Sequence, residues 1–192
     1  MREDNHNYIE LALSYSAAGL DGEAAAVLRL MPRQNEPMAH YHLYRLTGDG
    51  EELAKAEEAD SSYCFPNRLE DMQILAYAAE NGGQHAAYYL GCLLYDRGRW
   101  QEARELWEKC AENISLPTVH RNLSLVYYNK LHDGVRALEE MEKAFAMDEK
   151  DARVFFELDQ LKKALNAPVE ERLACMEAYG EMLERRDDLY TE

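Results

Sequence analysis

The chain has 192 residues, of which 47% are hydrophobic and 30% are charged. This composition is typical of a folded, soluble protein and excludes a disordered chain. The charge is acidic, with 37 Asp and Glu against 21 Lys and Arg and a formal net charge of −16. Phosphate binding needs clustered Lys and Arg, so nucleic acid and anionic membranes are excluded as partners. The acidity is spread along the chain and predicts a solubilising surface, with a basic partner as the alternative.

No apolar run approaches the roughly 18 residues that cross a membrane. The polar N-terminus is not followed by an apolar segment of the signal-peptide type. We therefore expect a cytoplasmic protein.

The first predicted helix pair covers about residues 5–34. Its apolar and small residues recur at helical spacing on both sides of Gly19, and glycine suits a tight turn better than a helix interior. The positions that carry this pattern are Tyr8, Leu11, Ala12, Tyr15, Ala24 and Leu28.

Residues 35–66 predict a degenerate second pair. Tyr44, Gly48 and Ala56 keep part of the spacing, but Pro37 and His40 stand where apolar residues are expected. An extra helix is predicted over residues 67–83, opened by Phe65-Pro66-Asn67 and closed by Asn81-Gly82-Gly83. This insertion near 65–83 interrupts the period of the pattern.

Residues 84–116 repeat the spacing of the first pair. The interval from Leu to Gly is eight in both, Leu11 to Gly19 and Leu90 to Gly98. The interval from Gly to Ala is five in both, Gly19 to Ala24 and Gly98 to Ala103. Agreement at two intervals in distant segments indicates an internal repeat.

Two further pairs are predicted, over residues 117–151 and 152–180. Leu123, Tyr127 and Ala137 carry the pattern in the first, with a longer turn at 131–134. In the second, the turn Asn166-Ala167-Pro168 precedes a return helix over 169–179. Residues 181–192 are expected to begin a truncated further helix, which indicates that the chain is an excerpt of a longer protein.

The pattern resembles the tetratricopeptide repeat (TPR), a helix-turn-helix of roughly 34 residues. The resemblance implies an all-α fold over residues 1–192: a single TPR-like right-handed α-solenoid of antiparallel helix pairs, with about 9–11 helices. Residues 65–192 also resemble the TPR region of large bacterial proteins with an N-terminal domain of unknown function, suspected of a carbohydrate-related role. The phrases that carry this second resemblance are YYLGCLLYDRGRWQEARELWEKC, PTVHRNLSLVYYNK, KAFAMDEKDARVFFELDQL and ERRDDLY.

Such an array predicts a binding scaffold and not an enzyme. Neighbouring pairs must stack to bury their apolar faces, and the first helices then line a concave groove for a peptide or protein. The partner's identity stays open. The alternative is a non-catalytic segment that packs on another domain of its own polypeptide or mediates a homodimer. The groove candidates are Tyr88, Tyr95, Arg121, Tyr128, Asn129, Arg153, Phe156, Gln160 and Lys163.

No catalytic, cofactor or metal motif is recognised in the sequence. His40 and His42 are two residues apart and face different ways on a helix, which makes a poor metal pair. Glutamate pairs such as Glu51-Glu52 and Glu139-Glu140 fit exposed helix faces. The four cysteines are expected to be reduced core thiols at apolar helical positions: Cys64, Cys92, Cys110 and Cys175.

Overall fold

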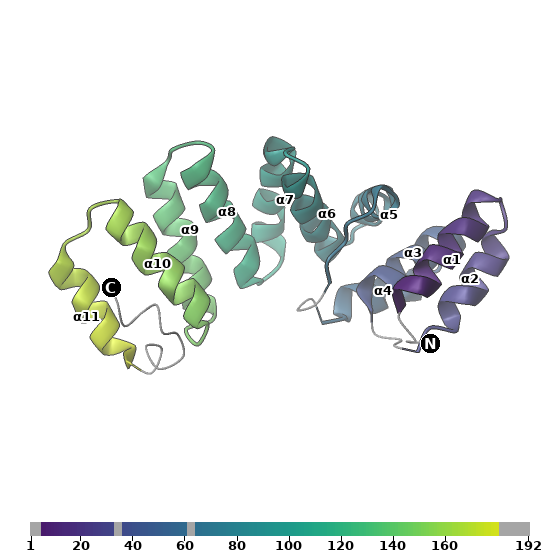
Figure 1. Ribbon diagram of the computed structural model, residues 1–192, viewed down its shortest axis with the longest axis horizontal. Helices are drawn as coiled ribbons and strands as arrows, with labels where there is room; N and C mark the ends of the chain where they lie inside the picture. Colours follow the sequence, from purple (N-terminus) through teal and green to yellow (C-terminus); the bar gives the residue numbers. More distant parts are fainter. Residues whose placement is uncertain (1–4, 33–35, 61–63, 181–192) are drawn as a thin grey trace. The chain divides into compact units, whose positions relative to one another are not determined.

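The computed structural model describes residues 5–32, 36–60 and 64–180. Within these ranges the chain forms eleven α-helices and no strand (Figure 1). None of these helices is long and apolar enough to cross a membrane. The chain divides into two compact units, residues 1–106 and 107–192, with the boundary inside α7 (Trp100–Asn113). The further helix expected over 181–192 lies outside the described residues.

Unit 1 consists of helices that pack mainly on their neighbours in the chain. Helix α1 packs on α2, α3 on α4, and α5 on α6, while α2 and α5 both contact α3. This is the short-range packing expected of a solenoid. The bounds are α1 Asn5–Ala17, α2 Asp21–Arg29, α3 Pro37–Thr47, α4 Gly50–Glu58, α5 Leu69–Glu80 and α6 Gln84–Asp96.

The turns of unit 1 follow the residues that predicted them. Gly19 and Gly98 have φ angles of 76° and 78°, in the left-handed region that disfavours other residues. Pro37 occupies the first turn of α3, where its missing N–H costs no hydrogen bond. The Asp49 side chain accepts a hydrogen bond from the Glu51 amide and caps α4.

Alanine residues let the helices of unit 1 approach closely. Five of them have no exposed surface: Ala24, Ala56, Ala78, Ala86 and Ala103. The larger buried residues Leu28, Tyr41 and Tyr89 fill the space between helices.

The inserted helix α5 leaves the contact between its neighbours in place. Glu57 of α4 accepts hydrogen bonds from the His85 and Ala86 amides at 2.7 and 3.1 Å, and so caps the N-terminus of α6. Its carboxylate also accepts the Tyr41 hydroxyl at 2.7 Å. A carboxylate at a helix N-terminus is favoured by both hydrogen bonding and the helix dipole.

Unit 2 continues the alternation with α8 Pro117–Asn129, α9 Gly134–Met147, α10 Ala152–Ala164 and α11 Val169–Ala178. Helix α9 packs on both α8 and α10. The rings of Phe145, Phe155 and Tyr179 form a cluster with centroids 4.9–5.5 Å apart. Pairs at such distances add to the stabilisation from buried area.

Two expectations about side-chain placement are wrong. Cys64 lies in the segment before α5, where burial raises the pKa of its thiol to about 12, and not on a helix. Glu52 and Glu140 do not lie on solvated faces, because each binds a histidine of the facing helix.

Candidate binding surfaces

Seven of the nine predicted groove residues lie on the two first helices of unit 2, α8 and α10. We call this set the α8–α10 surface: Arg121, Tyr128, Asn129, Arg153, Phe156, Gln160 and Lys163. Tyr128, Asn129, Arg153 and Lys163 are exposed, and the other three are half-buried. The other two, Tyr88 and Tyr95, are half-buried residues of α6 in unit 1.

A salt bridge joins the two helices of the α8–α10 surface. The Arg121 guanidinium donates from Nε and Nη2 to the Glu157 carboxylate at 2.5 and 2.6 Å. Arg153, one turn before Glu157, donates from Nε to the same carboxylate at 3.1 Å. Glu157 therefore neutralises the charge of Arg121. Arg153 also contacts Glu157, but 65% of its side chain is exposed to solvent.

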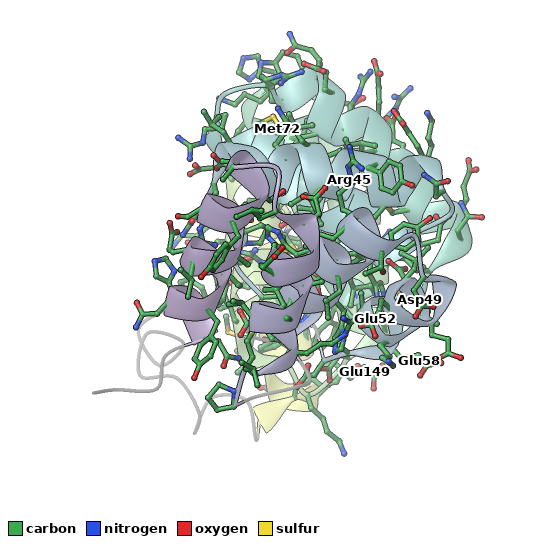
Figure 2. All side chains as sticks on the ribbon, turned by 90° about the vertical axis from the view of Figure 1, so that its right-hand side faces the viewer. Arg45, Asp49, Glu52, Glu58, Met72 and Glu149 are labelled. Atoms are coloured by element: carbon green, nitrogen blue, oxygen red, sulfur yellow. The ribbon has the colours of Figure 1, made fainter. Side chains whose placement is uncertain are left out.

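Charge is divided unequally between the helices of unit 2. Helices α8 and α10 carry four basic and two acidic residues, whereas α9 and α11 carry three basic and six acidic residues. The first helices thus have a formal charge of +2 and the second helices −3. In unit 1, second helix α4 likewise carries four acidic residues and one basic residue, and two of the acidic ones, Glu52 and Glu58, are labelled in Figure 2.

The sequence reasoning missed a three-residue cluster between α3 and α4. His40 Nδ1 lies 2.6 Å from Glu52 Oε2, and Lys55 Nζ donates to Glu52 Oε1 at 2.8 Å. Both His40 and Glu52 are buried, which explains how a histidine stands at an apolar position of the repeat.

The same cluster recurs in unit 2. His120 Nδ1 of α8 lies 2.6 Å from Glu140 Oε2 of α9, and Lys143 donates to Glu140 Oε1 at 2.6 Å. In both cases a Pro-x-x-His helix start faces a Glu-x-x-Lys stretch: Pro37–His40 with Glu52–Lys55, and Pro117–His120 with Glu140–Lys143. These spacings could have revealed the cluster from sequence.

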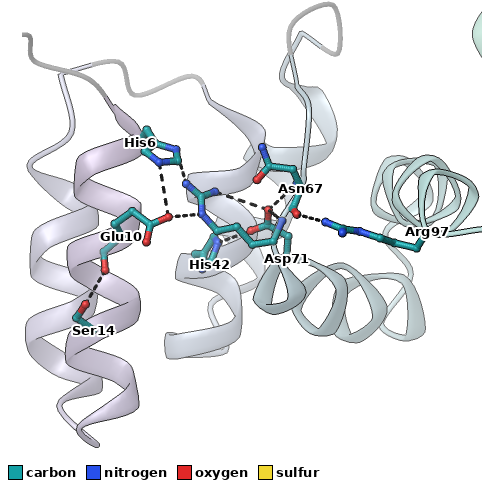
Figure 3. A network of polar contacts seen from close by, with 8 residues as sticks. His6, Glu10, Ser14, His42, Asn67, Asp71 and Arg97 are labelled. Atoms are coloured by element: carbon teal, nitrogen blue, oxygen red, sulfur yellow. Dashed lines mark hydrogen bonds and ion pairs between the residues drawn. The ribbon is translucent and has the colours of Figure 1, made fainter.

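Asp71 of α5 stands at the centre of a polar network in unit 1 (Figure 3). Its fully buried carboxylate accepts the amides of Asn67 and Arg68, each at 3.0 Å, and the His42 ring at 3.3 Å. Arg68 extends the network to α1 by donating to Glu10 Oε1 at 2.6 Å. The network fixes the inserted helix α5 against both α1 and α3.

The carboxyl groups of these clusters have shifted pKa values. Burial is the largest single influence on Glu52, Glu140 and Asp71, and it raises their pKa. Hydrogen bonds outweigh this effect of burial. They come from Lys55 and His40 at Glu52, from His120 at Glu140, and from His42 and two backbone amides at Asp71. The pKa of each carboxyl therefore lies below its ordinary value.

These shifts predict a loss of stability in acid. A carboxyl whose pKa is lowered in the folded state stabilises the fold, and this stabilisation is complete above the unfolded-state pKa of 4.5 for Glu and 3.8 for Asp. It is lost as the pH falls through the folded-state pKa values. Urea unfolding between pH 7 and pH 3 measures this slope. Glu140→Gln should flatten the slope below pH 4.5, and exposed Glu139→Gln should leave it unchanged. Equal slopes for the two variants would contradict the role assigned to Glu140.

The helix pairs, their glycine turns and their alanine contacts define a TPR-like α-solenoid.

No family model matches the chain. Its structure is similar to that of MamA residues 41 to the end from Desulfovibrio magneticus RS-1, with 14% identity and a TM-score of 0.53 over 97% of this chain and 98% of that one. Another crystal structure of MamA has 15% identity and a TM-score of 0.54 over 92% and 96% of the two chains. PilF from Pseudomonas aeruginosa has 22% identity and a TM-score of 0.51 over 94% of this chain and 75% of PilF. MamA and PilF are TPR proteins, and at these identities the likeness concerns the fold alone.

Proposed function

We propose that the chain is a scaffold that binds an extended segment of a partner protein along the α8–α10 surface. The observation that carries the proposal is the formal charge of +2 on these two helices, in a chain whose net charge is −16. Local charge opposite to the rest of the surface steers a complementary partner to one place. The expected partner is therefore a polar or acidic segment.

The side chains of the surface suit such a segment. Tyr128 and Phe156 offer aromatic area, and Arg153 and Lys163 offer positive charge. Tyr88 and Tyr95 are proposed as further contacts, made separately by α6.

Site-specific photocrosslinking tests the proposal. A photoreactive phenylalanine at Tyr128 should capture a partner in the cells that naturally make the protein, whereas the same residue at Glu139, on second helix α9, should not. Arg153→Gln/Lys163→Gln should lower the adduct about thirtyfold, since each of the two charged contacts contributes about 1 kcal/mol. The charge-matched control Lys109→Gln/Arg136→Gln, with both changes on second helices, should not lower it.

Equal adducts at positions 128 and 139 would contradict the α8–α10 surface. Adducts between two copies of the chain would favour a second candidate function, oligomerisation or packing on another domain of a larger, carbohydrate-related bacterial protein. One observation favours this candidate: Val169 and Leu173, one turn apart on the last described helix, are 67% and 53% exposed.

A further inference from the structure

Unit 1 contains a cavity of about 330 Å³ between α1, α3 and α5. Its apolar wall includes Ala12, Leu13 and Ile74, and its polar wall includes Ser16 and Gln73. The volume is in the range of sites that hold small ligands or a few residues of a peptide. None of the nine predicted groove residues lines it.

The inserted helix α5 supplies one wall of this cavity. Asp71 contacts His42, and two turns later Tyr77 stacks on Tyr44 with ring centroids 5.4 Å apart. These two contacts pack α5 on α3. The Asp71 network also ties α5 to α1, so all three helices that form the cavity are joined by side-chain contacts.

Arg45 of α3 is exposed and lines the cavity. Its guanidinium lies 4.8 Å from the centroid of the Tyr77 ring (Figure 2). This contact is its one interaction within the described ranges, which give it no carboxylate partner. By contrast, the guanidinium groups of Arg68, Arg99 and Arg121 all bind a carboxylate.

An arginine that is stacked on an aromatic ring keeps the N–H groups at its edge available for hydrogen bonds. Stacking also reduces the side-chain entropy that binding would otherwise cost. The ligand that fits such a group best is a carboxylate, which can accept two parallel hydrogen bonds.

We propose that this cavity binds a peptide segment of a partner protein that carries a single acidic residue beside an apolar one. The carboxylate pairs with Arg45, and the apolar side chain packs on Leu13 and Ile74. Asp21 and Glu70, which also line the cavity, disfavour a segment with several carboxylates. The site lies in unit 1 and is independent of the α8–α10 surface.

Three blocked peptides serve as probes: acetyl-Leu-Glu-Leu-amide, acetyl-Leu-Gln-Leu-amide and acetyl-Glu-Glu-Glu-amide. They are titrated into the ¹⁵N-labelled full chain and followed by NMR. The Leu-Glu-Leu probe should shift amide signals of residues 12–17, 42–46 and 70–77. The Gln and triple-Glu probes should bind about tenfold more weakly, the loss expected for one charge-assisted contact.

Arg45→Gln should weaken the binding of the Leu-Glu-Leu probe about tenfold. Lys109→Gln, which removes an exposed cation outside unit 1, should leave this binding unchanged. Gln73→Trp fills the cavity from an exposed position and should abolish binding while the helical circular dichroism is unchanged. Shifts outside unit 1, equal affinity for the Glu and Gln probes, or no shift at millimolar probe would overturn the proposal. Sodium acetate that binds as well as the peptide would also overturn it, because it would indicate a simple anion site. Arg153→Gln/Lys163→Gln should leave this binding intact, so the two proposals fail separately.

Discussion

Replacing Asp71 by alanine is expected to lower the free energy of unfolding by about 3–5 kcal/mol, because it removes the fully buried anion at the centre of its network. Asp71 has no exposed surface and accepts hydrogen bonds from two backbone amides and from the buried His42 ring. In the variant the buried His42 ring and the two part-buried amides lose their acceptor, and a buried donor without an acceptor costs about 1–3 kcal/mol.

Urea denaturation followed by circular dichroism measures this loss. Asp71→Asn should lose less, since its amide oxygen still accepts from the backbone. The neighbouring Glu70 is exposed, and Glu70→Ala should change the unfolding free energy by no more than about 0.5 kcal/mol. If Asp71→Ala were as stable as Glu70→Ala, the network would have no structural role.

Arg172→Met is expected to cost about 3–5 kcal/mol in unit 2. Arg172 of α11 donates from Nε and Nη2 to the Asp159 carboxylate of α10 at 2.8 and 2.5 Å. Both side chains are buried. Methionine keeps most of the side-chain volume but leaves the buried carboxylate without its cation, and an uncompensated buried charge is the larger penalty.

The double variant Arg172→Met/Asp159→Leu separates the charge effect from the packing effect. Replacing a whole buried pair by apolar residues is often neutral, so we expect its stability to return to within about 1 kcal/mol of the unsubstituted protein. Arg136→Met, at a side chain that is 63% exposed, should change it by less than about 1 kcal/mol. A double variant as unstable as the single one would show that packing, and not charge, determines the loss.

The sequence alone determined the helical fold of this protein. The repeated intervals from Leu to Gly and from Gly to Ala express local requirements: a left-handed turn at Gly98 and a small side chain at Ala103, where helices approach closely. The break at residues 65–83 was also visible, because Pro66 and Gly82-Gly83 are local signals. Requirements of this kind depend on a few adjacent residues, so they can be read without the tertiary structure.

The binding surfaces were predicted less completely. The repeat register placed seven candidates on α8 and α10, but it offered Arg121 as a free groove cation. Its carboxylate partner, Glu157, is 36 residues away and comes close to Arg121 only when α8 and α10 lie side by side. In so acidic a chain, residue type and spacing cannot show which of 37 carboxylates faces a given arginine.

Only the tertiary structure decided which polar residues are buried and what they bind. His40 and His42 are neighbours in sequence, yet one pairs with Glu52 of α4 and the other with Asp71 of α5. The packing of α5, and with it the cavity beside Arg45, also follows from contacts with α3 and not from the helical pattern of α5 itself. The physical reason is that helix periodicity fixes which residues share a face, whereas the partner of that face is set by long-range packing.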